Sequence, residues 1–421
     1  MKFMKVKEKN KRYQKNMGIT LIALVITIII LLILAGVSIA MLTGNNGILT
    51  QSKLAKENTQ AAKEDEENKL IDNNNYISEQ IGNVIPGKIV TETKKDNYVD
   101  INGDKATIPE GFEVDTTENV VSKGLVVHGP DKANEDNGSE FIWVPVPDIN
   151  SMSQCSTAGG DCNLQLENGV LKCKTHNDNE EIVGKLYATS IGENFGIVNT
   201  TYNSDGGLRE PAMVSNYDND SNHNTIGLKL LDMQRDYRNM ATSVAKYGGF
   251  YVGRYETSLS DAGVDLAGTN GTVQSKSGVI PTSAANSATS SWDGLYSKQK
   301  TYIKNSSSVE SSMIWGSQYD AMLKWAGNGN DKNKITNTSL GNNSSSRATI
   351  TGNNIYSNDS INNIRDLGGN LREWTLEASY TYNRVGRGGN YLDSSSPSYR
   401  YNYDSVGASS SNGSRLTLYV K

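Results

Sequence analysis

The chain has 421 residues, and its 41 basic side chains nearly balance its 46 acidic ones, giving a formal net charge of −5. This balance excludes a strongly basic protein that binds nucleic acid through its overall charge. Three histidines and three cysteines exclude a histidine-rich metal centre and a dense disulfide scaffold. The length allows two or three domains of about 100–200 residues each.

The N-terminal segment is basic and precedes a long apolar run. Residues 1–18 carry seven basic groups and one acidic group, and residues 19–42 carry no charge. A helix over that run extends about 36 Å, enough to cross a hydrocarbon core of about 30 Å. We therefore expect a single-pass transmembrane helix over residues 19–44 in the cell membrane, with the N-terminus in the cytoplasm and the C-terminal domain extracellular.

The same segment resembles the type IV prepilin signal. A basic leader ends at Gly18, and the apolar run starts at Ile19. The resemblance implies cleavage between these two residues by a prepilin peptidase, and association with other pilins in a pilus. The family usually has Glu at the fifth mature position, where this chain has Ala23. Loss of that buried charge leaves fibre assembly open, and a simple membrane anchor is the alternative.

Residues 45–84 carry a narrow apolar stripe among dense charges. This pattern is typical of an amphipathic helix. In pilins the continuation of the membrane helix packs against the globular head, and the prepilin resemblance implies the same packing here. A solvated stalk is the alternative interpretation.

From residue 85 to residue 421 the pattern changes. Pro86-Gly87 marks the boundary. Beyond it, short apolar runs such as 141–146 lie between segments rich in Gly, Asn and Ser, which is typical of strands. Two helical patterns, over 225–246 and 317–326, complete an α+β domain with much irregular loop. The domain also contains three polar tracts that we expect to form loops or insertions: 150–222, 257–291 and 327–360.

Several segments of this domain together resemble the formylglycine-generating enzyme family, also called sulfatase-modifying factors, whose fold is a variant of the C-type lectin fold. The segments are FIWVPV (141–146), YGGFYVGRYE (247–256), SMIWGSQYDA (312–321), NIRDLGGNLREWT (363–375), RVGRGGNY (384–391) and GSRLTLYV (413–420). Their order and spacing match the family over residues 105–421. The resemblance implies a C-type-lectin-like domain over residues 85–421. We expect three large aromatic side chains in its core, Trp143, Trp315 and Trp374.

Asn370 and Glu373 form a candidate metal site. They are three residues apart, so in a helical turn both side chains can face one point. Amide, carboxylate and backbone carbonyl oxygens suit Ca²⁺, and the family resemblance implies a structural calcium at this segment. We therefore assign candidate Ca²⁺ ligands to Asn370, Leu371 and Glu373. The alternative is that Glu373 caps a turn or pairs with an arginine.

The family enzyme oxidises a substrate cysteine with two cysteines of its own and copper. Alignment of residues 388–391 with the family motif puts Asp393 and Ser398 at the two cysteine positions, and neither can replace a copper-binding thiolate. We therefore expect no catalysis. The cysteines of this chain lie far upstream, and their pairing stays open: Cys155, Cys162 and Cys173.

Residues 390–412 are rich in Ser, Tyr, Asn and Asp. Tyr offers rigid contact area, and Ser and Asn offer adaptable hydrogen bonds, so this composition is typical of binding surfaces. The segment resembles the hypervariable patch in variable proteins of diversity-generating retroelements, although the Asn- and Ser-rich composition of the whole chain is an alternative explanation. The candidate ligand contacts are Tyr391, Asp393, Tyr399, Tyr401, Asn402, Tyr403 and Asp404.

These observations predict a surface-displayed, membrane-anchored binding protein, such as a minor pilin, a pseudopilin or an adhesin. Its non-catalytic, lectin-like head would contact a protein or glycan ligand. Ca²⁺ is the one cofactor expected, and nucleic acid is not an expected partner. A metal-dependent oxidoreductase of the formylglycine-generating enzyme superfamily and a structural pilus subunit are the alternatives.

Overall fold

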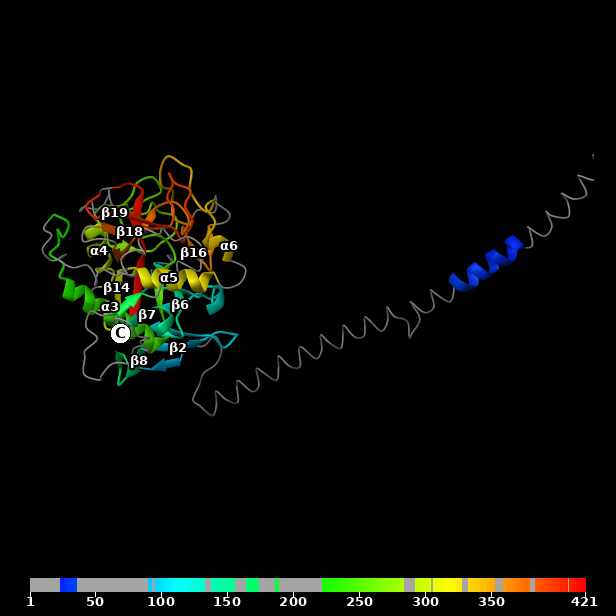
Figure 1. The fold of residues 1–421 in the computed structure, drawn as a ribbon, viewed down its shortest axis with the longest axis horizontal. Coiled ribbons are helices and arrows are strands. Elements are labelled where there is room, and N and C mark those ends of the chain that lie inside the picture. Colours follow the sequence, from blue (N-terminus) through cyan, green and yellow to red (C-terminus); the bar gives the residue numbers. More distant parts are fainter. Residues whose placement is uncertain are drawn as a thin grey trace, which may run out of the picture. The chain divides into compact units, whose positions relative to one another are not determined.

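The chain divides into two compact units, Met1–Asn83 and Val84–Lys421 (Figure 1). The second unit combines antiparallel sheets with a few helices. The computed structural model describes residues 23–35, 90–92, 95–132, 138–155, 164–173, 186–188, 222–283, 292–303, 306–327, 332–352, 359–378, 383–407 and 409–421.

Two sheets form the centre of the second unit. The larger has six strands in the order β14-β21-β11-β6-β5-β4, and the other has four in the order β19-β18-β17-β20. Their strands are β4 (Glu113–Val114), β5 (Val126–His128), β6 (Glu140–Pro145), β11 (Gly249–Gly253), β14 (Val309–Met313), β17 (Arg372–Ala378), β18 (Asn383–Arg387), β19 (Arg400–Asp404), β20 (Asn412–Ser414) and β21 (Leu416–Val420). The strand expected at 141–146 corresponds to β6, with its start one residue earlier.

Smaller sheets surround these two. They are β1 (Val90–Glu92) with β2 (Lys95–Val99) and β3 (Lys105–Pro109), β7 (Ser153–Cys155) with β10 (Leu186–Ala188), β8 (Leu164–Glu167) with β9 (Val170–Cys173), β12 (Ser258–Leu259) with β13 (Val273–Gln274), and β15 (Ser360–Ile361) with β16 (Ile364–Arg365). Some of these strands fall in tracts expected as loops. The hairpin β8–β9 forms because Asn168 (φ 50°) and Gly169 (φ 77°) adopt the left-handed backbone that a two-residue turn requires.

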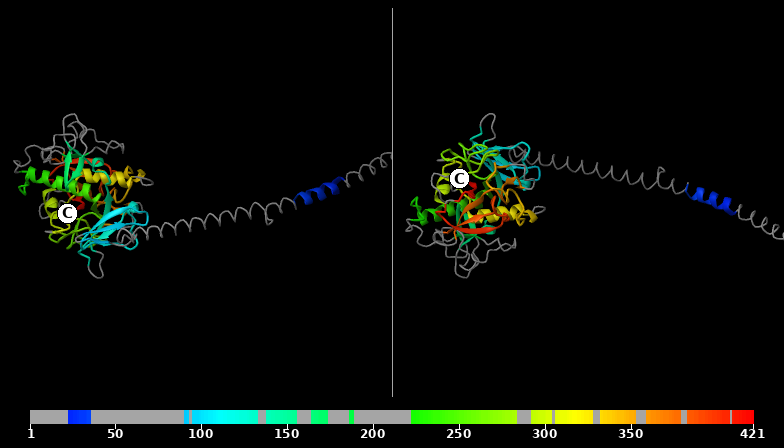
Figure 2. Two further views of the ribbon diagram at one scale, coloured as in Figure 1. Left: turned by 90° about the horizontal axis from the view of Figure 1, so that it is seen from below. Right: turned by 90° about the horizontal axis from the view of Figure 1, so that it is seen from above.

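The helices cover parts of these sheets. They are α3 (Leu230–Tyr247), α4 (Trp292–Gln299), α5 (Gly316–Ala326) and α6 (Lys332–Ile335), with short 3₁₀ turns η1 (Val121–Lys123) and η2 (Ile149–Ser151). Helix α3 packs against β11 and β21, and α5 packs against β6 and β17; Figure 2 shows α3 in green and α5 in yellow from two further sides. Trp143, Trp315 and Trp374 are buried, so their expected place in the core is confirmed.

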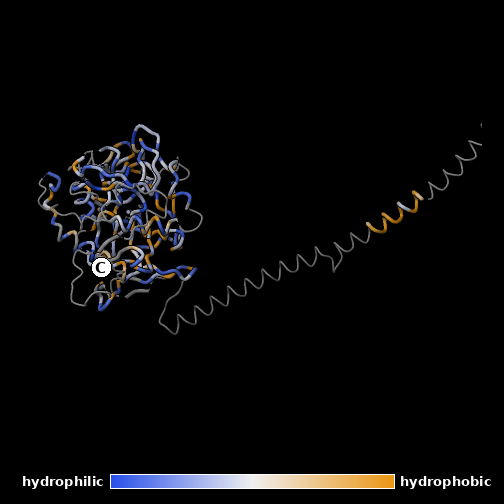
Figure 3. Tube along the Cα trace, in the orientation of Figure 1, coloured by the Kyte–Doolittle hydropathy of each residue, from blue (hydrophilic) through white to orange (hydrophobic). Residues whose placement is uncertain are grey.

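The described part of the first unit is one helix over residues 23–35, which is strongly apolar (Figure 3). Within the described residues, no helix has both the length and the apolar character that crossing a membrane requires. This finding contradicts the expected transmembrane helix over residues 19–44. It also contradicts the single-pass localisation built on that helix.

Other N-terminal predictions fall outside the described residues. These are the leader over 1–18, the cleavage position between Gly18 and Ile19, and the amphipathic segment over 45–84. The side chains of the three cysteines lie outside the described set as well. Prepilin processing and cysteine pairing therefore stay predictions.

Candidate ligand-binding site

Strand β19 contains Tyr401 and Tyr403, and Tyr399 directly precedes it. It lies at the end of the four-stranded sheet and pairs antiparallel with β18, with Tyr401 opposite Gly386 and Tyr403 opposite Arg384. Successive side chains of a strand point to opposite faces, so residues two apart share a face. The ring centroids of Tyr399 and Tyr401 are 6.3 Å apart, and those of Tyr401 and Tyr403 are 4.5 Å apart. We call these three side chains the tyrosine ladder.

A buried arginine lies against the ladder. The guanidinium carbon of Arg372, at the start of β17, is 6.0, 5.2 and 5.5 Å from the ring centroids of Tyr399, Tyr401 and Tyr403. A guanidinium near aromatic faces is attracted by their quadrupoles, more strongly when it is desolvated. Arg372 is only 1% exposed, so this attraction acts in a region shielded from water.

Hydrogen bonds fix the orientation of Arg372. Its Nε donates to the carbonyl oxygen of Gly388 at 3.2 Å, and its two terminal nitrogens donate to the Tyr403 hydroxyl and to the Asp393 carboxylate. The side chain crosses β18 at Gly386, where an added Cβ would lie 2.8 Å from the Arg372 Cδ. A glycine at this position therefore lets the arginine reach the ladder.

The predicted ligand contacts divide into two groups. Asp393 and the tyrosine ladder meet around Arg372, and Tyr401 is 40% exposed there. Tyr391 is buried instead, with its hydroxyl 3.0 Å from the Ser410 Oγ. The remaining two lie in β19 outside the ladder: Asn402, which is half-buried, and Asp404, which is exposed.

The composition argument missed two exposed apolar side chains in the same tract. Leu392 is 65% exposed and Val406 is 39% exposed. Large apolar side chains in a polar tract were the available sequence signal, and exposed positions of this kind add contact area to a binding surface. We define the tyrosine face as the tyrosine ladder together with Leu392 and Val406.

A buried network of charges supports the opposite side of β19. Arg400 donates to Asp320 of α5 at 2.5 Å and approaches Glu377 of β17 at 3.1 Å. Arg387 of β18 donates to the same Asp320, and all four side chains are at most 3% exposed. Burial, together with the neighbouring Arg400 charge, lowers the pKa of Arg387. These bonds hold β18 and β19 against α5, so the tyrosine face has a fixed base.

The predicted metal ligands do not form a helical turn. Asn370 has a left-handed backbone (φ 64°), and Glu373 lies in β17. The Glu373 carboxylate binds Arg415, with Nε at 2.9 and 3.1 Å from its two oxygens. The expected helical turn is therefore wrong, and the alternative of an arginine partner for Glu373 is observed.

Asn370 and Leu371 donate hydrogen bonds to another buried carboxylate, that of Glu256. The Asn370 Nδ2 and the Leu371 backbone N–H donate to Glu256 at 2.6 and 2.7 Å. Burial, with the carboxylates of Asp366 and Glu373 nearby, holds the pKa of Glu256 well above its usual value. In the described residues, no three acidic, histidine or cysteine side chains are grouped to hold a metal ion. Calcium binding at this segment stays a prediction.

The two positions aligned with the family's cysteines have structural partners. Asp393 accepts from Arg372, and the buried Ser398 Oγ lies 3.2 Å from the Ser396 Oγ. Both side chains therefore contribute to holding the loop before β19. The expected lack of catalysis remains a prediction.

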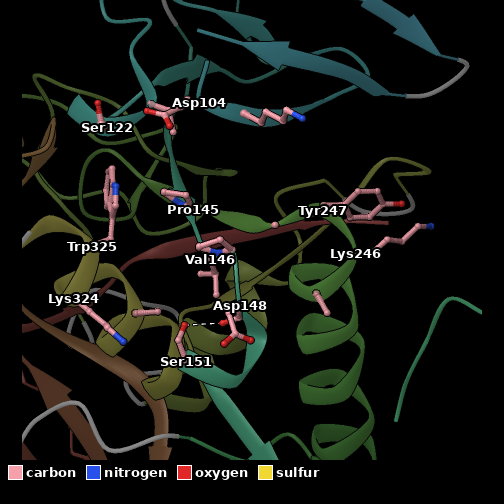
Figure 4. A pocket seen from close by; sticks show the side chains of 16 residues that line it. Asp104, Ser122, Pro145, Val146, Asp148, Ser151, Lys246, Tyr247, Lys324 and Trp325 are labelled. Atoms are coloured by element: carbon pink, nitrogen blue, oxygen red, sulfur yellow. Dashed lines mark hydrogen bonds between the residues drawn. The ribbon is translucent and has the colours of Figure 1, made fainter. Parts of the chain in front are cut away.

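The second unit contains a cleft away from the tyrosine face. Its volume is about 790 Å³, and Figure 4 shows Trp325 of α5 on one side and Tyr247 of α3 on the other. Lys246 and Lys324 reach its rim, and Asp148 and Ser151 line the end near η2. The cleft shares no lining residue with the tyrosine face.

A smaller cavity of about 210 Å³ lies beside the tract that was predicted to bind ligand. Tyr391 and Ser410 of that tract contribute to its wall. The complete lining is Asp265, Leu266, Ala267, Ile280, Pro281, Ser283, Arg347, Ala348, Leu371, Tyr391 and Ser410. Tyr391, a predicted ligand contact, therefore faces this cavity and not the ladder.

Comparisons with known proteins give little further information. No protein-family model matches the sequence, and no curated protein matches it. Among solved structures, the chain is similar to Treponema denticola variable protein 1 at 14% sequence identity, covering 41% of this chain and 85% of that chain, with a TM-score of 0.27. A structural likeness this weak carries no argument about fold or ligand. The family resemblances therefore rest on the sequence motifs, and the site is interpreted from its own geometry.

Proposed function

We propose that this protein is a ligand-binding protein that contacts another protein through its tyrosine face. The observation that carries this proposal is the exposed Tyr401 against the buried Arg372, in a tract that also exposes Leu392 and Val406. Tyrosine supplies a large, rigid and amphipathic contact area and is enriched at binding surfaces.

Preorganisation of the face supports this role. A side chain that becomes ordered only on binding costs about 0.5–1.5 kcal/mol of affinity. Here Tyr403 is held by Arg372 through its hydroxyl, and Tyr401 packs against Tyr403 at 4.5 Å between ring centroids. The buried contacts of Arg400 fix the strand beneath them. Little of this cost remains to be met when a ligand binds.

An array of purified proteins and glycans, probed with the full chain, tests the proposal. The informative variant is Tyr401→Ala, and Ile101→Ala is the matched control because Ile101 is an exposed apolar side chain outside the tyrosine face. We expect at least one protein ligand that binds the wild type and Ile101→Ala equally and binds Tyr401→Ala about tenfold more weakly. Ligands that are all glycans, or that all ignore Tyr401→Ala, would contradict the proposal.

A further inference from the structure

The small cavity beside Tyr391 has a rigid wall. The Tyr391 backbone N–H donates to the Asn370 carbonyl oxygen at 2.9 Å, and the Tyr391 carbonyl oxygen accepts from Ser345 at 2.9 Å. The carbonyl oxygen of Arg347 accepts from the side chains of Asn342 and Ser345 at 3.1 and 2.6 Å. The loop that carries Arg347 is therefore tied to the tract that carries Tyr391.

Backbone hydrogen bonds also hold the segments that form the rest of the cavity wall. Ile280 donates its backbone N–H to the Gly263 carbonyl oxygen at 2.9 Å, and Gly263 donates to Leu266 at 2.9 Å. Thr282 donates to the Thr257 carbonyl oxygen at 2.9 Å. Both walls are held by backbone hydrogen bonds, so the cavity keeps its shape without a ligand.

The cavity lining is aliphatic apart from the polar groups of Asp265, Ser283, Arg347, Tyr391 and Ser410. Leu266, Ile280 and Leu371 are among the side chains that line it, and Leu266 is 74% exposed. Arg347 brings a guanidinium, and no described residue forms an ion pair or a side-chain hydrogen bond with it. Asp265 also lines the cavity, and within the described part of the chain no ion pair joins it to Arg347.

A buried hydroxyl supplies independent evidence for a ligand. Ser283 is 2% exposed, lines the cavity, and has no hydrogen-bond partner for its Oγ within the described part of the chain. A buried polar group without a partner destabilises the state that contains it. A ligand that offers a polar atom to Ser283 would remove that destabilisation.

We propose that this cavity binds the C-terminal residue of a protein ligand, with its apolar side chain among Leu266, Ile280 and Leu371 and its carboxylate on Arg347. The inference rests on the proposed function, because the C-terminal residue in the cavity would belong to the same protein ligand that contacts the tyrosine face. A guanidinium recognises a carboxylate through two parallel hydrogen bonds. The volume is below the range of about 300–1,000 Å³ for sites that hold drug-sized ligands, so the cavity suits one residue.

The lining favours a peptide terminus over an acidic glycan. Sugars offer several hydroxyls that need polar partners, and most of this lining is aliphatic. Asp265 repels any further acidic group that a ligand carries beside the carboxylate bound to Arg347. The cavity therefore selects a ligand with a single carboxylate beside an apolar group. A C-terminal Leu, Ile or Val has both features.

Isothermal titration of the full chain with N-acetyl-L-leucine tests the proposal, since this compound carries the side chain and the carboxylate of a C-terminal leucine. N-acetyl-L-leucinamide lacks the charge and is the matched ligand. Arg347→Gln removes the guanidinium, and Arg235→Gln is the control because Arg235 is an exposed arginine of α3 outside the cavity. We expect the amide to bind the wild type about tenfold more weakly than the acid. We expect Arg347→Gln to weaken binding of the acid about tenfold, and Arg235→Gln to leave it unchanged.

Three results with the wild type would overturn the proposal. They are equal binding of the acid and the amide, tighter binding of N-acetylneuraminic acid than of N-acetyl-L-leucine, and tighter binding of free L-leucine, which would assign Asp265 to an amine. Unchanged binding by Arg347→Gln would overturn it as well. If N-acetyl-L-leucine fails to bind while a protein ligand still depends on Tyr401, only the cavity assignment fails. If the cavity binds N-acetyl-L-leucine and no ligand depends on Tyr401, the proposed function fails.

Discussion

The guanidinium carbon of Arg372 lies 5.2 Å from the ring centroid of Tyr401, so a buried cation supports the most exposed ring of the tyrosine ladder. The two residues belong to β17 and β19, which do not pair with each other, because β18 lies between them. Arg372 reaches the ladder across Gly386 of that middle strand. The conformation of the tyrosine ladder therefore depends on a side chain that is itself almost fully buried.

Replacement of Arg372 by an uncharged side chain should lower the free energy of unfolding. Arg372→Leu removes the donors to Gly388, Tyr403 and Asp393. Asp393 is 47% exposed and can be hydrated, so we expect a loss of about 1–3 kcal/mol in the free energy of unfolding and not the full cost of a stranded buried charge. Urea unfolding measures the loss. A variant as stable as the wild type would show that these bonds contribute nothing to the native state.

The glycine under Arg372 offers a matched pair of substitutions. At Gly386 an added Cβ would meet the Arg372 Cδ at 2.8 Å, whereas at Gly263 it would meet no atom within 4 Å. We expect Gly386→Ala to lower the free energy of unfolding by about 1–3 kcal/mol through overpacking. Gly263→Ala should leave it unchanged or raise it by up to about 1 kcal/mol, by restricting the unfolded chain. Thermal unfolding compares the two, and equal effects would contradict the steric argument.

Asp320, whose carboxylate binds both Arg387 and Arg400, should be essential for the stability of the protein. Asp320→Ala leaves Arg387 and Arg400 buried without their common partner. Breaking such a pair costs about 3–5 kcal/mol. Asp232→Ala is the control, because it breaks an exposed ion pair with Arg235 that contributes about 0–1 kcal/mol. Chemical unfolding of both variants checks the contrast, and a loss below 1 kcal/mol for Asp320→Ala would refute it.

Stability should depend on pH through Asp359. Burial, together with the neighbouring Asp366 carboxylate, raises the pKa of Asp359 well above its usual value, whereas an unfolded Asp has a pKa of about 3.9. Between these two values the native state binds more protons than the unfolded state, so this group lowers native stability as pH rises from about 4. Asp359→Asn should therefore stabilise the protein at pH 7 and change little near pH 4. Urea unfolding at both values tests this, and lower stability of the variant at pH 7 would contradict it.

The composition of residues 390–412 placed Tyr399, Tyr401 and Tyr403 among the candidate contacts but predicted no strand there. The structure brings them to one face because they alternate along and beside β19. Strand β6 and helix α5 follow equally local apolar patterns. The hairpin β8–β9 was missed, although its Asn168-Gly169 turn is a strong local signal.

Long-range contacts were not predictable in the same way. Glu373 was expected to turn toward Asn370, but its partner is Arg415, 42 residues along the chain. Arg372 and Asp393 were not expected to meet, because their contact depends on how β17 and β18 pair. Tyr391 was grouped with the ladder by composition and lies in the wall of the cavity instead. Spacing within one segment carries no information about a partner on another strand.

Strand β19 pairs with β18 alone within the described sheets. A new side chain at position 401, where the tyrosine is 40% exposed, would leave the hydrogen bond between Arg372 and Tyr403 in place, while Arg400 keeps its attachment to α5 on the other side. Under the proposed function, such an arrangement separates the side chain that contacts a partner from those that maintain the architecture. Evolution could thus retarget the protein repeatedly at small cost to its folding.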